Sequence, residues 1–114
     1  MTYDDLSEFS SETSIGTIRV RILDLENGLL ILITDKDRFR LGLSAVAIPP
    51  GQGSSEPTST GLFSVGLDNA LVRTVSERVA SWTNRTCMIV SGLPQMNRET
   101  MLEIVSLLRD YLVT

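Results

Sequence analysis

The sequence has 114 residues, of which 42% are hydrophobic and 21% are charged, so its length and composition are those of one globular domain. Its net charge is −4, and the first fourteen residues contain Asp4, Asp5, Glu8 and Glu12 but no basic residue. The remaining residues carry ten acids and ten bases, which argues against nucleic-acid binding because that function requires a net basic face.

Several kinds of site are excluded by the residues that the sequence lacks. There is no histidine, the commonest metal ligand and the usual proton carrier near neutral pH. Cys87 is the single cysteine, so the chain has neither an internal disulfide nor a cysteine cluster for a metal. No apolar run approaches the roughly 20 residues that span a bilayer, and the acidic N-terminus is unlike a secretory signal. We therefore expect a cytoplasmic protein that has no cofactor and no membrane partner.

Residues 1–14, with the sequence MTYDDLSEFSSETS, are acidic and rich in serine, so we expect a flexible tail. The alternative is a short helical or extended arm that docks Tyr3, Leu6 and Phe9 on a neighbour. Residues 15–114 are then expected to form a single domain.

Residues 15–48 predict three strands in an antiparallel meander. One side of the first strand carries Ile18, Val20 and Ile22. The other side carries Arg19, Arg21 and Leu23, as in a half-buried strand. Asn27-Gly28 predicts a tight hairpin turn, and residues 29–34, LLILIT, are apolar on both faces and therefore central to the sheet. The alternation over residues 39–48 predicts the third strand, paired with the second.

A turn centred on Asn27 places Ile22 opposite Leu32, and this register divides the meander into two faces. The face expected to lie under the helices carries Ile18, Val20, Ile22, Leu30, Leu32, Phe39, Leu41 and Leu43. The opposite face mixes arginines with aliphatic residues, a composition found at protein interfaces. We predict that a partner protein binds there, through Arg19, Arg21, Ile31, Ile33 and Arg40. The alternative is a solvated face with a few harmless aliphatic side chains.

Residues 49–60, PPGQGSSEPTST, predict a loop. Its Gly-Gln-Gly segment lacks the lysine of a phosphate-binding loop. Residues 62–67 predict a strand, after which Asp68 is expected to cap a helix. Apolar residues recur at helical spacing from Leu71 to Trp82, and Asn84 is a suitable residue to end that helix.

Residues 86–92 predict a further strand with Cys87 in the core, and Asn97 is expected to cap a last helix. The short joints on either side of the first helix make its two flanking strands parallel if they share a sheet. The expected fold is therefore α/β, of the α+β type: one domain with a mainly antiparallel sheet of five to six strands, one parallel relation and two helices.

No set of residues in the sequence points to catalysis. Without histidine or a usable cysteine, catalysis would depend on carboxylates, hydroxyls or the one lysine. The aspartates Asp24, Asp35, Asp37 and Asp68 lie in predicted turns or caps, where aspartate has structural uses. The composition thus favours a binding module over an enzyme.

In the order of its elements, the chain resembles the small proteasome assembly chaperones, the third and fourth members of the eukaryotic set and their archaeal relatives. The resemblance covers roughly residues 15 to 112. It is carried by the segments Ser59-Thr60-Gly61-Leu62, Gly66-Leu67-Asp68, Ala80-Ser81-Trp82-Thr83-Asn84 and Cys87-Met88-Ile89-Val90-Ser91.

The resemblance implies a mainly antiparallel sheet packed with helices, and a homodimer or a heterodimer with a paralogue. It also implies a protein without enzymatic activity that binds proteasome α-subunits and promotes assembly of the α-ring. Two other classes remain: a different small dimeric regulatory or scaffold module of the longin or roadblock kind, and a small-molecule binder or enzyme that uses loop 49–60.

Overall fold

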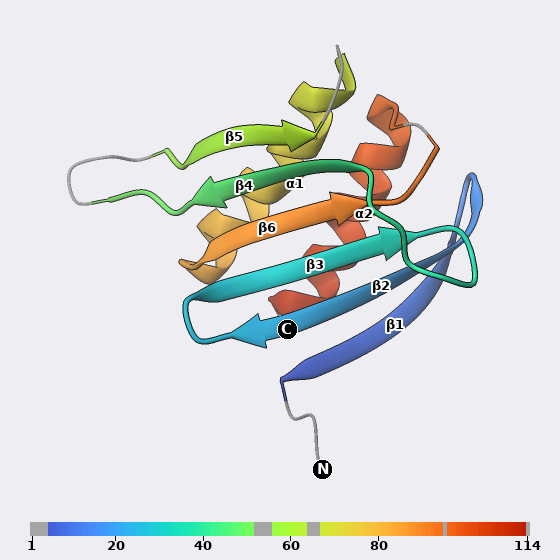
Figure 1. Ribbon diagram of the computed structural model, residues 1–114, viewed down its shortest axis with the longest axis horizontal. Helices are drawn as coiled ribbons and strands as arrows, with labels where there is room; N and C mark the ends of the chain where they lie inside the picture. The colour runs from blue at the N-terminus through green and yellow to red at the C-terminus, as the bar shows by residue number, and fades with distance from the viewer. Residues whose placement is uncertain (1–4, 52–55, 64–66, 95, 114) are drawn as a thin grey trace.

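A computed structural model describes residues 5–51, 56–63, 67–94 and 96–113, without the side chains of residues 63 and 67–69. Both helices lie on one face of a single six-stranded sheet, so the domain has two layers (Figure 1). The elements in chain order are β1 (Leu6–Thr13), β2 (Gly16–Leu25), β3 (Gly28–Thr34), β4 (Leu43–Ile48), β5 (Thr58–Phe63), α1 (Leu67–Thr83), β6 (Thr86–Ser91) and α2 (Arg98–Leu112). The predicted α+β class, with a mainly antiparallel sheet and two helices, is confirmed.

The strand order across the sheet is β1-β2-β3-β6-β4-β5. Every adjacent pair is antiparallel except β3 and β6, which are parallel. One parallel relation was expected between the strands that flank α1. Those strands, β5 and β6, do run the same way, but β4 lies between them and pairs with both. The third strand of the predicted meander is therefore misplaced, because β4 pairs with β6 and β5 and not with β3.

The core lies between the sheet and the helices. On β2 and β3 the alternate residues Ile18, Val20, Ile22, Leu29, Ile31 and Ile33 are buried. Opposite them, the helices bury Val72, Val75, Val79, Ala80, Met101, Ile104, Val105 and Leu108. Cys87 is fully buried on β6, and burial raises the pKa of its thiol to about 12. The predicted role of Cys87 as a core residue is confirmed.

The helix ends follow the predicted chemistry in two places. Asn97 caps α2, where its side-chain oxygen accepts a hydrogen bond from the Thr100 backbone N–H at 2.8 Å. Asn84 follows α1 with a φ of 56°, the left-handed conformation that asparagine tolerates well. Asp68 falls inside α1 and not before it, and its side chain lies outside the described residues. No helix in the described ranges has the length and apolar character needed to cross a membrane.

The N-terminal segment differs from the prediction. Leu6–Thr13, expected in a flexible tail, form β1 and pair with residues 16–23 of β2 at one edge of the sheet. None of its eight residues is buried. The strand is held by backbone pairing with β2 and by side-chain contacts, since Phe9 packs against the core and Glu8 contacts Arg19 and Arg21. Residues 1–4 lie outside the described part of the chain.

The turn between β2 and β3 sets a register that differs by one residue from the prediction. Leu25 pairs with Gly28, so the turn consists of Glu26 and Asn27, and Ile22 pairs with Ile31 and not with Leu32. Gly28 belongs to β3, where a Cβ atom would clash with the backbone carbonyl oxygen of Thr86 on β6. The glycine is thus required by the close parallel strand. A shift of one residue moves every side chain of a strand to the other face.

Candidate functional site

The face of the sheet that the helices leave uncovered, here called the open face, is the candidate site (Figure 1). One row of mutually paired residues crosses the whole sheet on this face. It consists of Leu6, Leu23, Leu30, Met88, Val46 and Thr60, one residue from each strand. We call this the apolar row. Its four inner members are half-buried although no helix covers them. A sheet of this kind usually exposes polar residues on its uncovered face.

A second row runs beside the first and changes in character along its length. It consists of Glu8, Arg21, Leu32, Val90 and Ser44. Val90 and Ser44 are 5% and 6% exposed, so this end of the row is nearly closed to solvent. The second row is therefore charged over β1 and β2 and apolar over β3 and β6, whereas the apolar row continues across all the strands.

Two shallow hollows lie on the open face, one on each side of Met88. One has a volume of about 240 Å³ and is lined by Leu25, Asn27, Gly28, Leu29, Leu30, Val46, Thr86 and Met88. The other has a volume of about 270 Å³ and is lined by Leu41, Gly42, Ser44, Met88 and Val90. Both linings are mainly apolar, which suits aliphatic side chains of a partner better than a polar ligand.

Leu41 is 91% exposed, and the residues on either side of it hold it beside the second hollow. Arg40 donates a hydrogen bond from its guanidinium to the carbonyl oxygen of Gly92 at 2.6 Å. At Gly42 the backbone lies so close to the Ser91 carbonyl oxygen that a Cβ atom would clash with it. Leu41 is thus a projecting apolar side chain between two fixed backbone positions.

Arg19 and Arg21 lie side by side on β2 and share the carboxylate of Glu8. The guanidinium of Arg21 lies 2.8 Å from one Glu8 oxygen, and that of Arg19 contacts the other. These hydrogen bonds, from Arg19 first and then Arg21, hold the pKa of Glu8 below its ordinary value. The ring of Phe39 lies over both guanidiniums, 5.1 Å from that of Arg19 and 4.6 Å from that of Arg21.

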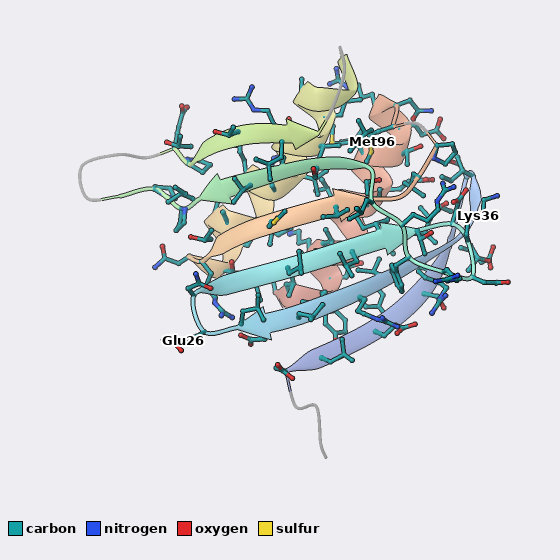
Figure 2. The ribbon with its side chains drawn as sticks, in the orientation of Figure 1. Glu26, Lys36 and Met96 are labelled. Atoms are coloured by element: carbon teal, nitrogen blue, oxygen red, sulfur yellow. The ribbon has the colours of Figure 1, made fainter. Side chains whose placement is uncertain are left out.

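Arg19 also fixes the chain segment that follows β3. Arg19 donates hydrogen bonds to the carbonyl oxygens of Lys36 and Asp37. Lys36 lies at the end of β3 opposite the turn that contains Glu26, as the labels in Figure 2 show. The carboxylate, the aromatic ring and these carbonyls leave the arginines ordered, so their side chains are prepared for contact with a partner at little further cost in entropy.

The predicted partner-binding residues divide into two groups. Arg19 and Arg21 lie on the open face, and Arg40 lies beside it at the end of β6. Ile31 and Ile33 are 0% and 1% exposed and pack in the core beneath the helices, so their assignment to a partner surface is wrong. The cause is the one-residue difference in register, which places Leu30 and Leu32 on the open face instead.

Residues Leu41 and Met88 were missed as site residues. Leu41 was assigned to the core face because residues 39–48 were expected to pair with β3. The structure leaves residues 39–42 outside any strand. Met88 lies on a strand that is distant in sequence from β3 and joins it only through the parallel pairing. A local alternation pattern carries no signal for such a pairing.

Loop 49–60, the alternative site, leads into β5, and its residues 52–55 lie outside the described residues. A hollow of about 320 Å³ beside it is lined by Glu56, Pro57, Glu77, Arg78 and Ser81. The Ser59 hydroxyl donates to the Glu77 carboxylate and accepts from Arg73 at 3.0 Å. These bonds attach β5 to α1, which gives the polar residues here a structural use. Among the described residues, no group of acidic or cysteine side chains is suited to hold a metal ion.

The fold has a counterpart among proteins of known structure. It is similar to that of a chain from the crystal structure of a novel chaperone complex for yeast 20S proteasome assembly, with a TM-score of 0.67 over 96% of each chain. The fold resembles that of a proteasome assembly chaperone. The two sequences are 17% identical, so the likeness is one of fold. No family model and no curated protein matches the sequence. The resemblance predicted from the sequence is thus confirmed at the level of the fold.

Proposed function

We propose that this protein is a non-enzymatic, dimeric assembly chaperone of the cytoplasm that binds proteasome α-subunits and promotes formation of the core-particle α-ring. The observation that carries the proposal is the similarity in fold to a chain of a yeast proteasome assembly chaperone complex, because it covers 96% of both chains. Because the match covers 96% of both chains, it favours this function over a longin-like or roadblock-like module.

The open face supports the dimeric part of the proposal. It combines the apolar row, two hollows and a projecting Leu41, and it is bordered by the ordered pair Arg19 and Arg21. Interfaces are enriched in arginine and in aromatic and methionine side chains, with an apolar centre and a polar rim. The partner is a second copy of this chain or a paralogue with a similar face.

Native mass spectrometry of the purified protein tests the dimer. We expect a mass of two chains, and we expect Leu41→Glu to convert it to a folded monomer because the charge would lie in the interface. Leu102→Glu is the matched control: Leu102 is a 51% exposed leucine on α2, away from the open face. A Leu41→Glu variant that remains as dimeric as Leu102→Glu would show that the open face is not the dimer contact.

A second measurement tests the chaperone function separately. The protein is mixed with proteasome α-subunits of the same organism, and complexes and rings are followed by native mass spectrometry. We expect a complex with at least one α-subunit and a larger fraction of complete rings. If the protein is dimeric but forms no complex and leaves ring formation unchanged, the chaperone function is wrong while the assignment of the open face stands.

A further inference from the structure

Leu41 and the hollow beside Gly28, here called the Gly28 hollow, are a projection and a recess on the same open face. Leu41 is almost fully exposed, and the residues on either side of it are held against the end of β6. The Gly28 hollow lies toward the start of β6, where Thr86 is part of its lining. Met88 lies between the projection and the recess. A face that carries both features on opposite sides of one residue is suited to contact a second copy of itself.

The recess exists because the residues that form it are small. Gly28 has no side chain, and the carbonyl oxygen of Thr86 leaves no room for a Cβ atom at that position. On the other side of the apolar row, the same two strands carry Leu32 and Val90, which pair with each other as Gly28 pairs with Thr86. Each of these central strands therefore has a large residue on one side of the row and a small residue on the other.

A two-fold axis that runs along the apolar row brings these features together. Two copies that pack face to face are related by an axis in the plane between them, and each patch then contacts the corresponding patch of the partner. This axis places Leu32 opposite the partner's Gly28, and Leu41 over the partner's Gly28 hollow. An axis along β6 would place the two Leu41 side chains against each other. The first arrangement therefore fills the recess, and the second does not.

The charged groups of the open face are compatible with this contact. They lie over β1 and β2, where the Glu8 carboxylate is already paired with Arg19 and Arg21, so they form a polar rim that requires no opposite charge from the partner. Exposed apolar residues, Leu25 and Ile48, extend the apolar area on the side of the Gly28 hollow.

The size of the face is also that of an interface. Six strands about 4.8 Å apart and about 20 Å long form a face of roughly 600 Å². The relief of its side chains adds to this area, which is of the order of the roughly 800 Å² that each partner contributes to a stable contact. Two sheets that pack face to face keep their strands within about 30° of one line, as this axis allows.

We infer that the open face binds a second copy of this chain, with the two-fold axis along the apolar row and with Leu41 of each copy in the Gly28 hollow of the other. The strands of the two sheets run antiparallel across this contact. The inference rests on the dimeric part of the proposed function, and it specifies the partner and the register that the proposal leaves open.

An exchange of charges tests the contact between Leu41 and the Gly28 hollow. Leu41→Glu and Thr86→Lys each place charges in the interface, so each alone should raise the dissociation constant of the homodimer at least about hundredfold. Mixed in equal amounts, the two variants should form a dimer with the summed mass of one chain of each in native mass spectrometry. One of its two contacts pairs the new carboxylate with the new ammonium group, and the other contact is native.

Leu23→Lys is the matched control for Thr86→Lys. Leu23 is half-buried on the apolar row, where it faces the partner's Leu23 across the axis and lies away from Leu41. Leu23→Lys should also weaken the homodimer, but mixing it with Leu41→Glu should not restore a dimer. Circular dichroism of each variant checks that the monomers are folded.

Cysteine substitutions test the same contact without added charge. An equal mixture of Leu41→Cys and Thr86→Cys chains, oxidised with glutathione disulfide, should give a disulfide-linked pair on non-reducing electrophoresis. Leu41→Cys alone should give no linked dimer, because this axis keeps the two substituted positions apart. Cys87 is fully buried and is present in every chain, so the oxidised native chain is the control.

The inference is overturned if Leu41→Cys alone forms a linked dimer, if the cysteine mixture forms none, or if the charge variants do not combine. If one of these results occurs while the native chain is dimeric, the open-face dimer stands and its register is wrong. A native chain that is monomeric would overturn both the register and the homodimer, whereas the measurement with α-subunits tests the chaperone function independently.

Discussion

Replacing Ile31 or its neighbour Leu32 with alanine tests which face of β3 packs in the core, because the two variants should lose different amounts of unfolding free energy. Ile31 is 0% exposed in the middle of the sheet, and Leu32 is half-buried on the open face. Ile31→Ala removes the equivalent of three buried methylene groups, worth about 2.4 kcal/mol at roughly 0.8 kcal/mol each. The cavity left behind raises the total loss to about 3.5 kcal/mol of unfolding free energy. Leu32→Ala should cost about 1 kcal/mol, because part of that side chain remains in water.

Equilibrium urea unfolding, followed by circular dichroism, provides both free energies. The measurement is made at two protein concentrations, since a contribution of Leu32 through the dimer would depend on concentration and that of Ile31 in the core would not. Equal losses, or a larger loss for Leu32→Ala, would refute the register described here. They would restore the assignment that a turn centred on Asn27 predicts.

Three further predictions concern single side chains. The pKa of Glu8 is lowered on folding by its two arginines, so its contribution to stability should be present above about pH 4.5 and be lost as the pH falls through the folded value. The difference in unfolding temperature between the native chain and Glu8→Gln should therefore shrink on acidification, and a constant difference would contradict it. Cys87, buried with a pKa of about 12, should not react with a thiol reagent at pH 8 until urea unfolds the chain, and rapid labelling of the folded protein would contradict its burial. Asn97→Ala should lower the unfolding free energy by about 1 kcal/mol through loss of the α2 cap, whereas an unchanged value in urea titration would mean that the bond to Thr100 contributes nothing.

Features encoded by neighbouring residues could be predicted from the sequence. The alternation of Ile18, Val20 and Ile22 placed β2 correctly, and their burial confirms which side faces the helices. The cap at Asn97 and the helix end at Asn84 follow from side-chain and backbone preferences that act within a few residues. These signals were sufficient for the fold class.

Features that depend on distant residues could not be predicted in the same way. Gly28 indicated a turn, yet its position is fixed by the carbonyl oxygen of Thr86, a residue on the last strand. In the resulting register, Leu30 and Leu32 lie on the open face. Ile31 and Ile33, which were predicted there, lie in the core. β1 has the composition of a tail, and it is ordered by backbone bonds to β2 and by side-chain contacts with residues distant in sequence, those of Phe9 with Tyr111 and of Glu8 with two arginines of β2.

The central position of β6 has a consequence for how the chain acquires its structure. The hairpin formed by β2 and β3 and the pair formed by β4 and β5 share no hydrogen-bonded strand pair, and β6 bonds to both. Residues 86–91 are made after every other strand. During synthesis, β3 and β4 therefore each expose an unpaired apolar edge until Ser91 has left the ribosome. A chain that stops before residue 86 would hold two separate half-sheets with edges open to aggregation, and the domain can become a single cooperative unit only once its last quarter has been added.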